Sequence, residues 1–155
     1  FILSHKVLPH MLERNYGHIL MMSPPVDTSV MRNHGAYGVS KFGMSMIAQA
    51  IAEECEDTGV TAHALWPATA VETAATINFG LGNAAMWRSP QILADASLEL
   101  FAQNPATCKG QAWIDEDVLK NAGVEDFSSY RCDPDHEPPH LNIKDIPPVS
   151  APPKN

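Results

Sequence analysis

The sequence predicts an α/β fold, a doubly wound parallel sheet with helices on both faces. Apolar strand-like segments alternate with helical ones along the chain, which is the pattern of parallel βαβ units. These strand-like segments are apolar at nearly every position, as strands buried on both faces are. The composition, with 45% hydrophobic and 18% charged residues in a chain of 155, is that of one ordinary folded domain.

A helix and a strand are expected first. Residues 1–15 carry apolar side chains at helical spacing, with Pro9 expected to bend the helix and Asn15-Tyr16-Gly17 to end it. The run His18–Ser23 is almost continuously apolar and predicts a buried strand. A pair of prolines ends this strand because proline cannot donate a hydrogen bond to the ladder. A helix already under way at residue 1 suggests that the chain is the carboxyl-terminal half of something larger.

A loop, a long helix and a second strand follow. We expect the loop over Val26–Gly35 and the helix over Ala36–Glu56, which is rich in Ala, Met and Glu. The apolar positions of this helix, three and four residues apart, are Phe42, Met46, Ile47, Ala50 and Ile51. Gly59 ends the helix, and Val60–Trp66 has strand character until a proline breaks it.

The next segment, Ala68–Arg88, has small residues and no firm period, so we interpret it as a flexible lid or pocket wall. Four of its side chains either line an apolar substrate pocket or anchor the loop: Phe79, Leu81, Met86 and Trp87. Ser89-Pro90 is a typical helix start, because the hydroxyl can cap the helix and proline suits its first position. This helix is expected to run to about Ala102.

The remaining elements are short. A strand is predicted over Gln111–Ile114 and a brief helix over Glu116–Ala122, with Asp115 as its cap and Gly123 as its end. Prolines concentrate beyond residue 132 and predict an extended, mobile tail. The chain therefore divides into residues 1–132 and a tail over residues 133–155.

Three polar side chains form a candidate acid–base site. Tyr37 and Lys41 lie four residues apart at the start of the long helix, so both project from one face. A phenol with a pKa of about 10 is a poor acid–base group at neutral pH, and a nearby cation lowers that pKa by favouring the phenolate. Ser23, at the end of the preceding strand, could reach the same pocket and donate a hydrogen bond to a carbonyl oxygen.

This constellation resembles a known family. Tyr-x-x-x-Lys preceded by a serine at a strand end is similar to the short-chain dehydrogenase/reductase family, nicotinamide-dependent oxidoreductases with a Rossmann-like fold. Gly17–Ser23 resembles the strand that delivers the serine, and Pro67–Thr73 resembles the loop that contacts the nicotinamide. The resemblance extends to about Cys132. Three segments are most similar to the hydroxysteroid dehydrogenase-like branch: Ser23-Pro24-Pro25, Ala64-Leu65-Trp66-Pro67 and Ile114-Asp115-Glu116.

The resemblance implies hydride transfer between NAD or NADP and an alcohol or ketone of a fairly apolar substrate. Tyr37 would be the general acid–base, and Ser23 would orient the substrate oxygen. Lys41 would bind the nicotinamide ribose hydroxyls and lower the pKa of Tyr37.

The resemblance also implies that Pro67, Val71 and Thr73 contact the nicotinamide end of the cofactor, Val71 through its backbone and Thr73 through its hydroxyl. The alternative is that Thr73 or Thr69 caps a short helix beginning near residue 74.

The sequence departs from the family pattern in two ways. Ala68 follows Pro67 where the family has glycine, and the loop is one residue longer before Thr73. The Gly-rich turn, the Asn-Asn-Ala-Gly segment and the helix asparagine of the family are absent and are expected to lie upstream of Phe1. A dinucleotide needs those glycines at its pyrophosphate, so this chain by itself is expected to bind cofactor poorly and to be inactive.

Charge and cysteine content limit the partners and the compartment. A net charge of −8 disfavours nucleic acid and anionic lipid surfaces, and no apolar run is long enough for membrane insertion. Cys55, Cys108 and Cys132 are widely spaced and contain no C-x-x-C pair, which favours the cytoplasm or another reducing intracellular compartment. Cys55 is expected to be a packed small hydrophobe. The acidic and histidine residues of the tail are expected to be solvated and to bind no metal.

Three further interpretations concern assembly and alternative functions. The helix that starts at Ala36 is expected to pair with its copy in a homodimer or homotetramer, which the family resemblance favours. One alternative function is a non-catalytic oligomerisation module that has lost nucleotide binding. Another is a lyase or epimerase of the same fold that uses the same phenol.

Overall fold

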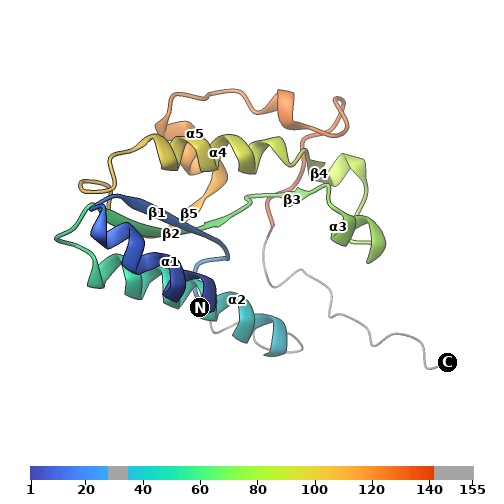
Figure 1. Cartoon of the computed structure of the whole chain (residues 1–155). Coiled ribbons are helices and arrows are strands. Elements are labelled where there is room, and N and C mark those ends of the chain that lie inside the picture. The colour runs from blue at the N-terminus through green and yellow to red at the C-terminus, as the bar shows by residue number, and fades with distance from the viewer. Residues whose placement is uncertain (28–34, 142–155) are drawn as a thin grey trace.

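The computed structural model describes residues 1–27 and 35–141 and confirms an α/β fold with a parallel sheet. Strands β1 (Gly17–Met22), β2 (Val60–Trp66) and β5 (Ala112–Ile114) form a three-stranded parallel sheet in the order β1-β2-β5. Helices α1 (Ile2–Glu13) and α2 (Gly35–Glu54) cover one face, and α4 (Gln91–Ala102) and α5 (Asp115–Asn121) cover the other (Figure 1). Most of the predicted loop Val26–Gly35 lies outside the described residues.

Two apolar cores hold the helices to the sheet. On the α2 side the buried residues are Met21, Ala48, Ile51, Cys55, Val60, Ala62 and Ala64, with Leu8 and Met11 of α1 packed against them. On the α4 side they are Leu65, Ile92, Ala96, Leu100, Val118 and Leu119. Cys55 is 3% exposed, which confirms it as a packed core residue.

The first helix ends as the sequence predicts. Asn15 has φ +49°, a left-handed conformation that asparagine tolerates better than most residues. Its Oδ1 accepts a hydrogen bond of 2.8 Å from the backbone N–H of Gly59. A Cβ at Gly59 would lie 1.9 Å from the Asn15 carbonyl oxygen, so glycine is required where β2 begins. The end of α1 is thereby fixed to the start of β2.

The buried face of α2 differs from the predicted one. Phe42 and Ile51 are buried as expected, but Met46 is 62% exposed and Ala50 is also exposed. The other buried positions of the helix are Gly38, Ser45 and Ala48. Small residues let the helix backbone approach the sheet closely, which leaves the larger Met46 on the opposite side.

β1 is also less buried than predicted. Three of its central residues are only partly covered, because β1 is an edge strand of the described sheet.

The segment Ala68–Arg88, interpreted from the sequence as a flexible lid or pocket wall without a firm period, contains short regular elements, and its lid role stays a prediction. This segment contains β3 (Ala70–Val71), α3 (Ala74–Asn78), the 3-10 turn η2 (Ala84–Met86) and β4 (Trp87–Arg88). β3 and β4 pair in parallel as a separate two-stranded sheet. Trp87 is buried and donates from Nε1 to the Leu81 carbonyl oxygen at 2.9 Å, so it anchors the loop. Phe79, in contrast, is 67% exposed.

The predicted elements after this segment are confirmed. The Ser89 hydroxyl accepts from the Gln91 N–H at 3.1 Å at the start of α4. Asp115, predicted as the cap of α5, is instead the first residue of that helix, where its Oδ1 accepts from the Glu116 N–H at 2.7 Å, and Ile114 is the cap. Gly123 follows α5 with φ +93°, the conformation that ends helices at glycine.

The proline-rich region is not extended throughout. The 3-10 turn η3 (Ser128–Tyr130) leads into residues 131–141, which we call the C-terminal segment, and this segment lies against the body of the protein. Antiparallel bridges join Arg131 to Arg88 and His140 to Thr69. Some of the acidic and histidine residues that the sequence predicted to be solvated therefore form ion pairs, among them Glu137 and His140. Residues 142–155 lie outside the described residues, and the domain division at residue 132 stays a prediction.

Buried His63 makes the stability of the fold dependent on pH. His63 of β2 is fully buried and accepts from Trp113 Nε1 at Nδ1, 3.3 Å away. Burial, with the neighbouring His18 ring, lowers the pKa of His63 to about 4. The unfolded chain takes up this proton near the ordinary histidine pKa of about 6.5, so the free energy of unfolding should fall by about 3 kcal/mol as the pH drops from 7 to 4.

Urea unfolding between pH 7 and pH 4 measures this effect. We expect His63→Gln to flatten the dependence and the exposed His10→Gln to leave it intact. If the free energy of unfolding of His63→Gln fell as steeply with pH as that of the unmodified protein, other groups would cause the effect.

Candidate functional site

The candidate site lies at the carboxyl edge of the three-stranded sheet (Figure 1). Met22 pairs with Leu65 where β1 ends, and Trp66 pairs with Ile114 where β2 and β5 end. Since carboxyl ends of parallel strands meet at one edge, the residues that follow these strands come together there. They are Ser23, Pro67 and Asp115.

Ser23 is fixed by its backbone, and its hydroxyl has no partner within the part of the chain that the structure describes. Its N–H donates to the carbonyl oxygens of Met21 and Leu65, at 3.0 and 3.1 Å. The residue is fully buried, yet its Oγ makes no hydrogen bond with any described residue. A buried hydroxyl without a partner is unfavourable by roughly 1–3 kcal/mol, so this oxygen is suited to bind a group that enters the site.

Lys41 lies over the same edge. Its Nζ donates to the Met22 carbonyl oxygen at 2.9 Å, directly before Ser23. The same nitrogen lies 5.6 Å from the centre of the Trp66 ring and 5.9 Å from that of Tyr37. The structure thus brings Tyr37 and Lys41 of α2 together with the ends of β1 and β2.

A second contact holds α2 in this position. Ser45, one turn after Lys41, is buried and donates from Oγ to the Pro24 carbonyl oxygen. Its Oγ is also 3.4 Å from the Lys41 carbonyl oxygen. The segment that follows Ser23 is therefore attached to the helix that carries Tyr37 and Lys41.

Burial shifts both titratable groups away from their charged forms. Desolvation raises the pKa of the Tyr37 phenol and lowers the pKa of the Lys41 ammonium. The net direction for the Tyr37 pKa is opposite to the one that the sequence predicted from a nearby cation, because desolvation by burial is the dominant cause. In this arrangement Tyr37 is a protonated phenol at neutral pH, the form that donates a proton.

The loop residues lie further along the chain. Pro67 follows Trp66 at the sheet edge, whereas Val71 is buried in β3. The Thr73 hydroxyl accepts from the Thr76 N–H at 3.2 Å, and Thr76 Oγ1 donates to the Thr73 carbonyl oxygen at 3.0 Å. Thr73 is therefore the cap of α3, the alternative that the sequence left open. Its contact with a cofactor stays a prediction.

Sequence reasoning missed a buried charged cluster beside this loop. Arg88, 2% exposed, contacts Glu116 of α5 and Glu137 of the C-terminal segment. Asp115 Oδ1 also accepts from the Ala68 N–H at 2.8 Å, and burial raises the pKa of this carboxyl group. Two features of the sequence could have indicated this cluster. One is the charged Arg88, which lies beside Trp87 just before a helix start, and the other is the acidic pair Asp115 and Glu116, which follows an apolar strand.

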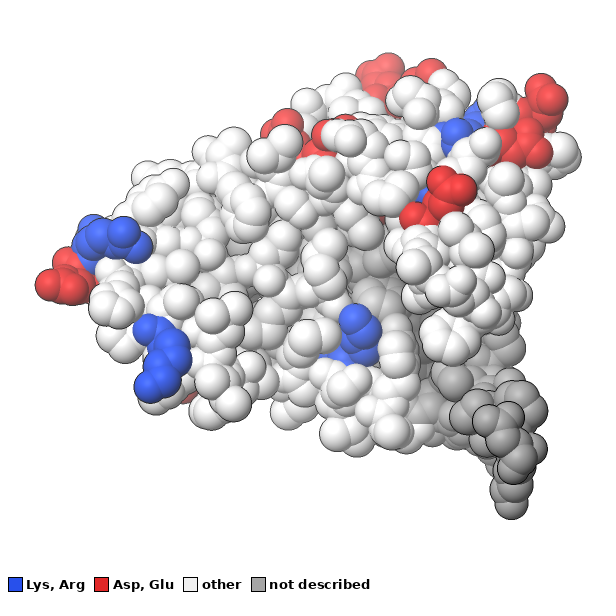
Figure 2. Space-filling view, turned by 45° about the vertical axis from the view of Figure 1, so that its right-hand side comes forward, with Lys and Arg blue, Asp and Glu red and all other residues white. Residues whose placement is uncertain are grey.

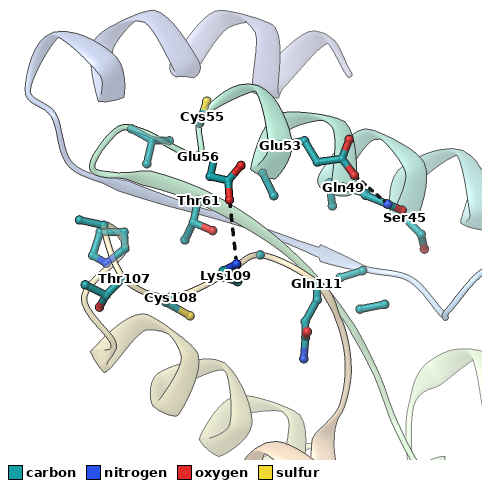
Figure 3. Close-up of a pocket in the computed structure, with 18 of the residues that line it drawn as sticks. Ser45, Gln49, Glu53, Cys55, Glu56, Thr61, Thr107, Cys108, Lys109 and Gln111 are labelled. Atoms are coloured by element: carbon teal, nitrogen blue, oxygen red, sulfur yellow. Dashed lines mark hydrogen bonds and ion pairs between the residues drawn. The ribbon is translucent and has the colours of Figure 1, made fainter.

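Two cavities lie on the described surface, and neither is lined by Ser23, Tyr37 or Lys41. The larger, about 740 Å³, lies between α2 and residues 105–112 and contains none of Ser23, Tyr37 and Lys41 (Figure 3). The smaller, about 450 Å³, adjoins the strand edge and is lined by Pro25, Asp27, Trp66, Pro67, Ala68, Ile114, Glu116, Asp117, Lys120, His140 and Leu141. Because Trp66 and Pro67, at the end of β2, line the smaller cavity, we regard it as the one related to the candidate chemistry.

The described ranges contain neither a metal-binding cluster nor a membrane-spanning helix. No group of three or more His, Cys, Asp or Glu side chains in residues 1–27 and 35–141 is arranged to hold a metal ion. None of the helices in those ranges is both long and apolar enough to span a bilayer. Figure 2 shows one face on which acidic and basic side chains lie close together at the upper right, while most of the face is uncharged.

Comparison with known proteins identifies the family. A profile described as short chain dehydrogenase matches residues 1–82, more than half of the chain. The chain belongs to the short-chain dehydrogenase family. Hydroxysteroid dehydrogenase-like protein 2 of Danio rerio is 39% identical over 139 residues, which cover 88% of this chain and 33% of that protein. This short-chain dehydrogenase chain therefore spans about a third of the length of the curated relatives it matches.

Solved structures agree with this assignment. A crystal structure of a short chain dehydrogenase from Mycobacterium thermoresistibile has a TM-score of 0.76 and 34% identity, covering 96% of this chain and 55% of that one. A structure from Xanthomonas campestris has a TM-score of 0.78 and 33% identity, covering 89% and 52%. The short-chain dehydrogenase fold and the resemblance to the hydroxysteroid dehydrogenase-like branch are confirmed.

Proposed function

We propose that this chain is the carboxyl-terminal half of a short-chain dehydrogenase domain and supplies the acid–base residues of an NAD- or NADP-dependent oxidoreductase. The observation that carries the proposal is the fully buried Ser23 hydroxyl, which has no hydrogen-bond partner among the described residues, at the edge where Lys41 contacts the end of β1. Tyr37 lies beside Lys41 and is 39% exposed, so its phenol is accessible to a substrate.

The described residues fit the nicotinamide and ribose end of such a cofactor. Lys41 Nζ has donor capacity left beyond its bond to Met22, and ribose hydroxyls can accept from it. When bound, the nicotinamide supplies or accepts a hydride. The glycine-rich turn that a pyrophosphate needs is absent from this sequence, so the chain alone should bind cofactor poorly.

Three side chains carry out the proton chemistry in this proposal. Ser23 donates from Oγ to the substrate oxygen and orients it. In the reducing direction Tyr37 gives its hydroxyl proton to that oxygen, and in the oxidising direction it takes the proton back. Because burial raises the pKa of Tyr37, oxidation should become faster as the pH rises and more phenolate forms.

The substrate proposed is an alcohol or ketone on a fairly apolar molecule, and the compartment proposed is reducing. The sheet-edge cavity supports a small-molecule substrate, and Trp66, Pro67 and Ile114 give it an apolar wall. The three free cysteines support the compartment.

Replacement of Lys41 tests its two proposed roles. Lys41→Ala in the complete protein should weaken cofactor binding and shift the pH optimum for oxidation upward, because no cation remains to favour the phenolate. Cofactor titration and a pH–rate profile measure both effects, with the exposed Lys6→Ala as the control. An unchanged profile would remove Lys41 from the mechanism.

A specific observation also favours self-association through α2. Val39 and Met46 are 68% and 62% exposed and lie seven residues apart, so they share one face of the helix. We propose that this face pairs with its copy in a homodimer or homotetramer.

Nucleotide binding separates the proposed functions. Titration of the complete protein with NAD and NADP, followed by assay with apolar alcohols and ketones, should show binding and hydride transfer. Self-association without affinity for either nucleotide would instead favour the oligomerisation module, and turnover of substrate without net change of cofactor would favour the lyase or epimerase.

A further inference from the structure

One buried guanidinium joins three parts of the chain. Arg88 of β4 places its Nη2 3.0 Å from Glu116 Oε1 of α5 and 2.6 Å from Glu137 Oε1 of the C-terminal segment. The ring of Phe127 covers the same guanidinium, with its centre 5.1 Å away. β4, α5 and the C-terminal segment are therefore attached to a single charged group.

Both carboxylates have further partners. Glu137 Oε2 accepts from Arg131 Nε at 2.7 Å within the C-terminal segment. Glu116 Oε2 lies 3.1 Å from Lys120 Nζ and 3.3 Å from His140 Nε2. The charged cluster thus also fixes the two ends of the C-terminal segment.

The C-terminal segment in turn holds the loop predicted to face the nicotinamide. The Leu141 N–H donates to the Ala68 carbonyl oxygen at 2.6 Å, and His140 forms an antiparallel bridge with Thr69. On the other side of the loop, the Glu72 N–H donates to the Arg88 carbonyl oxygen at 2.9 Å. The loop between Pro67 and Thr73 is therefore held by backbone contacts with β4 and with the C-terminal segment, two of the three parts that Arg88 joins.

The exposure of the two glutamates separates their roles. The Glu116 side chain is 5% exposed, so loss of Arg88 would leave a buried carboxylate and destabilise the whole fold. The Glu137 side chain is 54% exposed, and ion pairs at that exposure contribute little to global stability. The contact of Glu137 with Arg88 is thus better suited to fixing the C-terminal segment locally than to stabilising the whole fold.

We infer that Glu137 is a positioning residue: through Arg88 it holds the C-terminal segment closed, and the closed segment fixes the Pro67–Thr73 loop beside the sheet edge. This inference rests on the proposed function, in which that loop contacts the nicotinamide end of the cofactor.

The test compares Glu137→Gln with Glu137→Asp and with Glu99→Gln, an exposed glutamate on α4, in the complete protein. Hydrogen exchange reads the amides of Ala68, Glu72 and Leu141 without any need for turnover. Steady-state kinetics give kcat and the KM for NAD and NADP. We expect Glu137→Gln to speed exchange at these amides and to raise the cofactor KM by roughly threefold to tenfold with a smaller change in kcat. Glu137→Asp, which keeps the charge, should recover part of both effects.

Each contrary result has its own meaning. If these amides exchanged at the same rate in Glu137→Gln as in Glu99→Gln, Glu137 would not hold the C-terminal segment, and the inference would be wrong. If amide exchange became faster while the cofactor KM stayed unchanged, the contact of Glu137 with Arg88 would be purely structural. That result would also overturn the positioning role. If the unmodified protein neither binds nor uses a nicotinamide dinucleotide, the proposed function fails and the positioning role fails with it, while exchange still reports on the contact.

Discussion

Tyr37→Phe in the complete protein should lower kcat by roughly 10²- to 10⁴-fold, the contribution typical of a general acid–base. The substitution removes one oxygen and keeps the ring over which Lys41 lies, 5.9 Å from its centre. Cofactor affinity should therefore be nearly unchanged. Steady-state kinetics in both directions and a cofactor titration measure the two quantities separately.

Tyr16→Phe is the matched control. Tyr16 is 59% exposed at the end of α1, away from the sheet edge that carries Ser23 and Lys41, and its loss of a hydroxyl should not affect turnover. Both variants should unfold at the same urea concentration as the unmodified protein, because both phenols are exposed enough to be solvated. Near-normal kcat in Tyr37→Phe would contradict the acid–base assignment.

Arg88→Met should destabilise the fold by about 3 kcal/mol, the lower end of the range for breaking a buried ion pair. The removed guanidinium leaves Glu116 as a buried carboxylate, with a side chain only 5% exposed. Lys120 and His140 still contact its Oε2, which keeps the cost at the lower end. The contact between Arg88 and the Phe127 ring is lost as well.

A second substitution separates the charge effect from the packing effect. Glu116→Met in the Arg88→Met background should recover part of the lost stability, since two apolar side chains can replace a buried pair without an unpaired charge. Urea unfolding at pH 7 gives the free energies, and Lys6→Met, on the exposed face of α1, serves as the control. If Arg88→Met and Lys6→Met had equal free energies of unfolding, the buried ion pair would contribute nothing to the stability of the fold.

Local sequence features predicted most element boundaries correctly. The strand at Val60–Trp66 matches its predicted bounds, because an apolar run between Gly59 and Pro67 has unambiguous ends. The predicted hydrogen bond of Ser89 at the start of α4 is present, since it joins residues two positions apart. The predicted cap at Asp115 was wrong, because Ile114 is the cap of α5 and Asp115 lies within the helix. The segment Ala68–Arg88 could not be predicted in this way. Its two-residue strands exist because β3 and β4 pair with each other across the segment.

The sequence by itself determined the α/β class, the order of the strands along the chain and the placement of Ser23, Tyr37 and Lys41 at strand and helix ends. These depend on periodicity and on residues that end elements, which act over a few positions. Tertiary structure alone decided which side of α2 is buried, because only close approach to the sheet selects Ser45 and Ala48 over Met46. It also brought Glu137 to Arg88 across 49 positions, a pairing that depends on three-dimensional proximity and leaves no periodic signal in the sequence.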